Sequence, residues 1–133
     1  MLDWLKQLLF EKSDQGTLGQ RGENVAARFL RNLGYTIIIR NFKCKMGEVD
    51  IIARDGKTIV FVEVKTRADD SAAEPEQQVD ATKQQQLTKV AKFYLARYGR
   101  PQPPARFDVV AIVWRSGSDP VVRHIPDAFG PTF

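Results

Sequence analysis

The chain is poor in cysteine and histidine. Cys44 is the only cysteine and His124 the only histidine among 133 residues. A single thiol excludes a disulfide framework, and it fits the reducing conditions of the cytoplasm. His124 lies far in sequence from the charged cluster described below, so we expect no functional role for it.

Long apolar runs are also missing. Residues 1–12 have an amphipathic pattern whose apolar side is formed by Trp4, Leu5, Leu8 and Leu9. This segment is too short to span a bilayer, and its charges and lack of a small-residue cleavage site argue against a signal peptide. We expect no membrane association. Residues 1–16 would be an N-terminal extension that packs on the core, joins a dimer or touches a partner, and residues 17–133 a single domain.

Apolar periodicity and turn signals predict the order helix, three strands, helix, two strands. The apolar spacing predicts helices at 18–33, closed by Gly34, and at 80–98, stopped by a proline-rich link. Five strands are expected, at 35–42, 46–54, 57–67, 107–114 and 121–125, the last ended by Pro126. This order predicts an α/β layered domain with a mixed sheet.

Two of these strands carry charges where a buried strand should have none. The run 59–64 is rich in β-branched and aromatic residues, which is typical of a strand covered on both faces. Glu63 and Lys65 stand at its far end. An unpaired charge there would cost several kcal/mol, so these residues must be paired, bound to a metal, or open to a site.

The dipeptide Asp55-Gly56 predicts a two-residue type I′ turn between these strands. This turn would place Arg54 opposite Lys57. The same register sets Asp50 opposite Phe61 and Glu48 opposite Glu63, so that one face carries Glu48, Asp50, Glu63 and Lys65.

Three carboxylates on one patch repel one another unless a cation lies between them. Oxygen ligands favour a hard divalent ion, so we predict Mg²⁺ or Mn²⁺ at this site. The alternative is a solvated ion pair, which is the usual meaning of an acid and a lysine two residues apart. The apolar setting and the second acidic pair favour the functional interpretation.

Two residues on the predicted helices face the same region. Glu23 lies on the inward face near the start of the first helix, where it could reach the cluster or simply complement the helix dipole. Lys83 lies at the end of the apolar stripe of the second helix. Its stem could cover apolar surface, or its ammonium could contact a phosphate.

The distribution of charge indicates a polyanionic partner. The net charge is +4, but residues 68–80 hold five acids and no base, which leaves 20 basic against 11 acidic groups elsewhere. A basic surface around a metal-binding carboxylate site suggests nucleic acid, whose phosphates would supply both affinity and the scissile bond.

Five segments in order resemble the YraN family of small bacterial proteins. They are Gly-x-x-Gly-Glu-x-x-Ala at 19–26, Asn-Phe-Lys at 41–43, Gly-Glu-Val-Asp-Ile-Ile-Ala at 47–53, Val-Phe-Val-Glu-Val-Lys-Thr-Arg at 60–67 and Arg-Phe-Asp-Val at 106–109. That family is similar to the archaeal Holliday junction resolvases and, through them, to the PD-(D/E)XK restriction-endonuclease-like superfamily.

The resemblance implies a restriction-endonuclease-like αβββαβ core. It further implies Asp50 and Glu63 as metal ligands, Lys65 as the catalytic lysine and Glu23 as a supporting acid of the resolvase type. Glu48 has no counterpart in the wider superfamily, and a position behind the metal ligands is the role expected for it.

The predicted activity is Mg²⁺-dependent hydrolysis of DNA, with branched DNA in recombination or repair as the substrate. The carbonyl of Val64 would join Asp50 and Glu63 as a ligand, and Thr66 and Arg67 are candidate phosphate contacts. Paired incision of a junction implies a homodimer. The alternatives are a nucleic-acid-binding module without catalysis and a structural interaction protein.

Overall fold

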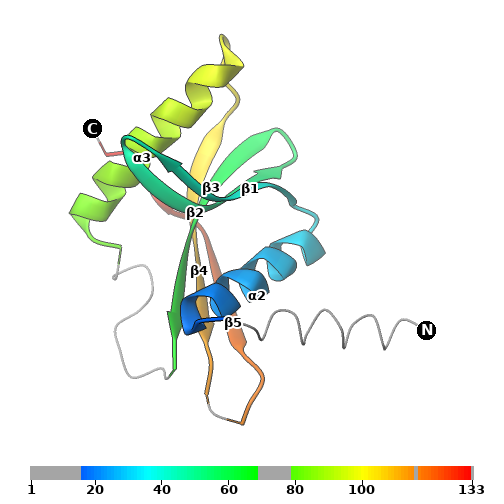
Figure 1. Cartoon of the computed structure of the whole chain (residues 1–133). Helices are drawn as coiled ribbons and strands as arrows, with labels where there is room; N and C mark the ends of the chain where they lie inside the picture. Colours follow the sequence, from blue (N-terminus) through cyan, green and yellow to red (C-terminus); the bar gives the residue numbers. More distant parts are fainter. Residues whose placement is uncertain (1–15, 69–78, 116, 133) are drawn as a thin grey trace.

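The helices and strands follow the predicted order along the chain (Figure 1). The structure is a computed structural model that describes residues 16–68, 79–115 and 117–132. The elements are helix α2 Leu18–Asn32, strands β1 Thr36–Cys44, β2 Gly47–Asp55 and β3 Thr58–Arg67, helix α3 Ala81–Leu95, the 3₁₀ turn η2 Ala96–Tyr98, and strands β4 Ala105–Val113 and β5 Val121–Phe129. The expected N-terminal amphipathic segment and most of the acidic loop lie outside the described residues.

The strands form one mixed sheet with the order β1-β2-β3-β4-β5. β3 and β4 are parallel, and the other neighbouring pairs are antiparallel. α3 lies in the crossover between the two parallel strands, as a parallel connection requires. The predicted α/β fold with an αβββαβ core and a mixed sheet flanked by helices is therefore confirmed.

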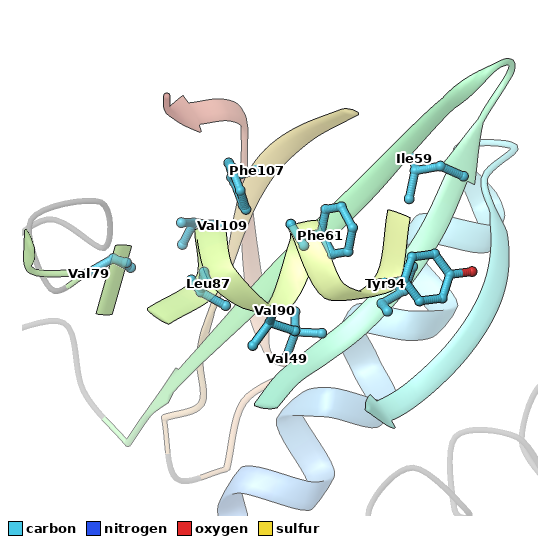
Figure 2. Close-up of a cluster of buried hydrophobic side chains, with 11 residues drawn as sticks. Val49, Ile59, Phe61, Val79, Leu87, Val90, Tyr94, Phe107 and Val109 are labelled. Atoms are coloured by element: carbon cyan, nitrogen blue, oxygen red, sulfur yellow. The ribbon is translucent and has the colours of Figure 1, made fainter. Parts of the chain in front are cut away.

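The two helices lie on opposite faces of the sheet (Figure 1) and bury two separate apolar clusters. On one face, Leu87, Val90 and Tyr94 of α3 pack on Phe61 and Phe107 (Figure 2). On the other face, Val25, Ala26 and Leu30 of α2 pack on the sheet around Val60 and Val62. β3 is thus covered on both sides, which explains its continuous apolar run.

Local capping signals set the helix ends. The Thr17 hydroxyl accepts from the Gln20 backbone N–H at 3.2 Å, and the Gln20 side chain accepts from the Thr17 N–H at 3.0 Å, which is a capping box. Asp80 caps α3 through the Lys83 N–H at 2.8 Å. No helix among the described residues is long and apolar enough to cross a membrane.

The hairpin turn differs from the predicted one. Asp55 pairs with Thr58, so the turn residues are Gly56 and Lys57 rather than Asp55 and Gly56. Gly56 has a φ of 60° while Lys57 has no positive φ, and a type II′ turn requires glycine at this first position. Consequently Arg54 pairs with Ile59, not with Lys57.

The last strand also extends further than the sequence suggests. β5 continues through Pro126 to Phe129, and its register shifts between the pairs with Phe107 and Val109. Asp127 has a φ of 51° within this irregularity. An edge strand has a partner on one side only, so a proline at a bulge need not interrupt it.

Candidate functional site

Asp50 stands where β2 and β3 separate. The β2–β3 ladder ends at the pair Ile51–Val62, and the next pair in that register would be Asp50 and Glu63. Instead of a backbone bond, the Asp50 carboxylate accepts from the Val64 N–H at 2.8 Å. A strand residue directs its N–H and C=O to the same neighbour, so the Val64 carbonyl also points toward β2.

The alternation of side chains breaks at the same place. Val49 belongs to the core beneath α3, whereas Ile51, two residues on, belongs to the core beneath α2. On β1, Asn41 lies between the paired residues Arg40 and Phe42 and has a φ of 55°. Two adjacent strands therefore change face together beside Asp50.

Glu63 is the buried acid of the site. Its side chain is 8% exposed, and its Oε2 atom has no hydrogen-bond partner among the described residues. Burial raises the pKa of Glu63 to about 8, helped by a shared hydrogen bond with Asp50 and by the charge of that residue. A buried carboxylate oxygen that lacks a hydrogen-bond partner and lies beside a second carboxyl group fits a cation site.

Two lysines face Glu63 and partly offset this shift of its pKa. The Lys83 ammonium on α3 lies 3.5 Å from Glu63 Oε2, so Lys83 forms an ion pair within the site rather than only covering apolar surface. Lys65 lies two residues along β3 from Glu63 and therefore on the same side of the strand. Its side chain makes no hydrogen bond or ion pair with another described residue.

Glu23 is held close to this site by β1. The Arg40 Nε and the Asn41 Nδ2 donate to Glu23 Oε1 at 3.0 and 2.9 Å. Asn41 lies opposite Asp50 in the β1–β2 register, because the flanking pairs are Arg40–Ile51 and Phe42–Val49. Glu23 is thus buried and inward-facing as predicted, and it is linked to the Asp50 position through Asn41.

Three carboxylates do not gather as predicted. Glu48 is exposed at the end of β2, and its contact is Lys43 at 4.0 Å. No group of three or more acidic, histidine or cysteine residues suited to a metal occurs among the described residues. The change of face at Asp50 separates Glu48 from the pair, so the carboxylates that remain together are Asp50 and Glu63. Two carboxylates completed by water and substrate phosphate still suit Mg²⁺.

Thr66 packs on helix α2 rather than standing open to a ligand. A Cβ atom added to Gly22 would overlap the Thr66 side chain, so glycine at this position allows α2 to pack closely on β3. Arg67 ends β3, where its carbonyl accepts from the Trp114 N–H at 2.8 Å. A phosphate contact for either side chain stays a prediction.

The close packing of Gly22 on the Thr66 side chain makes Gly22→Ala destabilising. The added methyl must displace Thr66 or the helix, and such overpacking costs about 1–3 kcal/mol. The second substitution Thr66→Ala removes the overlapping atoms and is expected to restore part of this loss. Denaturant unfolding of both single variants and the double variant measures the coupling. Additive losses would show that the two positions do not touch.

A buried polar network that the sequence did not reveal lies on β4. Asp108 is fully buried and accepts from Arg106 Nε at 3.0 Å and from the Asp127 N–H at 3.0 Å, and it lies 2.8 Å from His124 Nε2. Burial opposes ionisation, but these hydrogen bonds outweigh it and hold the pKa of Asp108 below its usual range. Arg106 also reaches Tyr35 at 2.6 Å. His124 is therefore explained as a structural partner, which the sequence spacing could not show.

The mixed five-stranded sheet and its two flanking helices form an α/β domain whose architecture is consistent with a nuclease-like core. The chain belongs to the family described as "Uncharacterised protein family UPF0102", which matches residues 22–112. This confirms the YraN-like membership, while the similarity to archaeal resolvases stays a prediction.

The match extends over most of each relative. The chain is 50% identical over 119 residues to the UPF0102 protein of Geotalea uraniireducens, covering 90% of this chain and 94% of that protein. It is 52% identical over 112 residues to the Geobacter sulfurreducens protein, covering 84% and 88%. The Nocardia farcinica protein is 42% identical over 122 residues, covering 92% and 96%.

Proposed function

We propose that this protein is a metal-dependent endonuclease that hydrolyses phosphodiester bonds in DNA. The observation that carries the proposal is the buried Glu63 oxygen without a hydrogen-bond partner, beside Asp50 and on the same side of β3 as Lys65. The Lys83 ammonium pairs with this oxygen at 3.5 Å, which is longer than a usual charge-assisted hydrogen bond, so a directly bound cation would satisfy the oxygen better.

The residues of the site divide into ligands and groups that act on the phosphate. Asp50 and Glu63, with the Val64 carbonyl, would hold Mg²⁺ or Mn²⁺. The ion supplies polarisation of the scissile phosphate and a lowered pKa for the attacking water. Lys65 donates to the phosphate oxygen on which charge develops, or orients the water. Glu23, fixed by Arg40 and Asn41, orients the groups around Asp50 from the α2 side.

The substrate we propose is branched DNA of the kind formed in recombination and repair. Support comes from the resemblance to the junction resolvases and from the excess of basic residues outside the acidic loop. Cutting a junction symmetrically requires two active sites related by a two-fold axis, so we further propose a homodimer working in the cytoplasm. Sedimentation of the free and junction-bound protein would give a monomer in both states if the dimer is wrong.

The direct test is cleavage and binding of branched, duplex and single-stranded DNA of matched length, in Mg²⁺, in Mn²⁺ and in EDTA. The proposal expects incision that requires the metal and is strongest on the branched substrate. Binding without incision would support a nucleic-acid-binding module of the same fold. Neither binding nor incision would support an interaction protein.

A further inference from the structure

An exposed aromatic side chain stands on the outer edge of α3. Phe93 is 43% exposed, and among the large apolar side chains that are exposed on the described residues it is the aromatic one. Its ring centre lies 6.4 Å from that of Phe42 on β1, with the planes inclined by 43°. Arg97, one helical turn further on, lies 4.0 Å above the Tyr94 ring and 5.8 Å from Phe42.

The surroundings of Phe93 are strongly basic. Residues 81–107 contain six basic residues and no acid. Lys89 and Arg97, four residues before and after Phe93, are exposed, and so is the adjacent Lys92. The neighbouring end of β1 adds Lys43 and Lys45, both exposed. Glu48 is the acid nearest in sequence to this strand end, and it is paired with Lys43. A planar apolar ring among cations suits a polyanion that carries aromatic groups.

Helix α3 links this surface to the candidate site, because it carries both Lys83 and Phe93. Lys83, which contacts Glu63, lies near the start of α3, and Phe93 lies ten residues further on, near the end of the helix. Arg97 follows in η2. Between Lys83 and Phe93, Gln86 contacts Gly47 at the start of β2, where a Cβ atom on Gly47 would overlap the Gln86 side chain. Ten residues of helix separate Lys83 from Phe93, which is roughly 15 Å at 1.5 Å per residue.

We infer that Phe93, supported by Phe42 and Arg97, is a stacking platform for an unpaired DNA base next to the cleavage site. Base stacking on an aromatic ring tolerates every sequence, and it requires a base outside a double helix. The basic residues around Phe93 would bind the phosphates on either side of that base. The inference rests on the proposed function, and it adds that the preferred substrate has unpaired nucleotides within about 15 Å of the scissile bond, the separation set by the helical rise.

The positive charge of the surface around Phe93 favours DNA over a second copy of the chain as the binding partner. Two identical faces with the same cluster of lysine and arginine residues would repel each other across a two-fold contact. A strand of nucleic acid neutralises the same residues. The surface therefore suits DNA better than another protomer.

The test compares Phe93→Ala with Phe93→Trp and with the control Val121→Ala, which removes an apolar side chain that is 58% exposed on β5. Affinities of the full chain for a forked DNA with unpaired arms and for a fully paired duplex of equal charge are measured by fluorescence anisotropy. Metal-free buffer separates binding from cleavage. We expect Phe93→Ala to weaken binding of the fork on the order of tenfold to a hundredfold, with duplex affinity unchanged. Phe93→Trp and Val121→Ala should bind as the wild type does.

Equal loss on fork and duplex, or no loss on either, overturns the platform. A change of sedimentation coefficient in Phe93→Ala alone also overturns the platform, because it would show that Phe93 lies in a contact between two copies of the chain. Circular dichroism confirms that each variant is folded. Metal-dependent cleavage by the wild type, with no effect of Phe93 on fork binding, would remove the platform and leave the nuclease. If binding of the fork depends on Phe93 but the wild type does not cleave DNA, the platform is supported and the proposed nuclease activity is refuted.

Discussion

Replacing Lys65 with Ala is expected to lower the rate of metal-dependent DNA cleavage by on the order of a hundredfold to a thousandfold, the usual cost of removing one preorganised donor to developing charge. DNA affinity should change little, because it comes from many phosphate contacts and chemistry from few residues. Lys65→Arg should not restore activity, since guanidinium differs from ammonium in reach and shape. Single-turnover cleavage at saturating protein isolates the chemical step.

Lys57 provides the matched control. It lies at the other end of the same hairpin, exposed in the turn between β2 and β3. Lys57→Ala removes the same charge without touching the site, so it should cleave as the wild type does. Glu63→Ala should be as inactive as Lys65→Ala. Full metal-dependent activity in purified Lys65→Ala and Glu63→Ala would refute the site.

Most of the fold could be predicted because its signals are local. The cap residues Thr17 and Asp80, the closing Gly34 and the spacing of apolar residues all act within a few positions. Gly34 has a φ of 97°, as its place after α2 requires. The covering of β3 on both faces followed from the continuous apolar run at 59–64.

The site could be predicted in part. The error in the hairpin register left Asp50 and Glu63 together, whereas the assumption of unbroken side-chain alternation misplaced Glu48. The hairpin register was wrong by two residues, and a shift of two returns every side chain to the same face. Asp50 and Glu63 therefore still met, directly opposite rather than diagonally. The position of Glu48 depended on unbroken alternation, which fails at Asp50 and Asn41. Nothing local in the sequence marks that break.

The Asp108 network shows the other limit of sequence reasoning. Arg106 and Asp108 are close in the chain, but Tyr35, His124 and the Asp127 N–H come from other elements. Only the pairing of β4 with β5 and the packing of α2 bring them together. The Phe93 surface was missed for a similar reason, since exposure of one aromatic residue on an amphipathic helix is decided by the strand beside it.

The second large effect is on stability, because Glu63 carries a raised pKa in the folded protein. Burial and Asp50 raise the pKa of Glu63 from 4.5 to about 8. Between these pH values the folded state keeps a proton that the unfolded state has lost. In EDTA the free energy of unfolding is therefore expected to fall as the pH rises through this window, by on the order of a few kcal/mol. Glu63→Gln should remove that slope.

Mg²⁺ should reverse the effect of pH, because a metal binds the ionised carboxylate. Stabilisation by Mg²⁺ is expected to grow as the pH rises toward about 8, the pKa to which burial and Asp50 raise Glu63. It should reach about 2.7 kcal/mol when free metal is 100 times its dissociation constant. Asp50→Asn should also melt higher than the wild type in EDTA, since it removes repulsion and still offers an oxygen to the Val64 N–H. It should gain much less from Mg²⁺.

Melting curves at several pH values, with Mg²⁺ and with EDTA, measure both effects for the wild type, Asp50→Asn and Glu63→Gln. Glu48→Gln is the control, because it removes an exposed carboxylate whose contact is Lys43. Its curves should follow the wild type in both buffers. In a structural ion-pair network, loss of Asp50 would lower the melting temperature in either buffer and Mg²⁺ would change little. That pattern would exclude a metal site where β2 and β3 separate. A metal site requires that Asp50→Asn melts higher than the wild type in EDTA and gains much less stability from Mg²⁺.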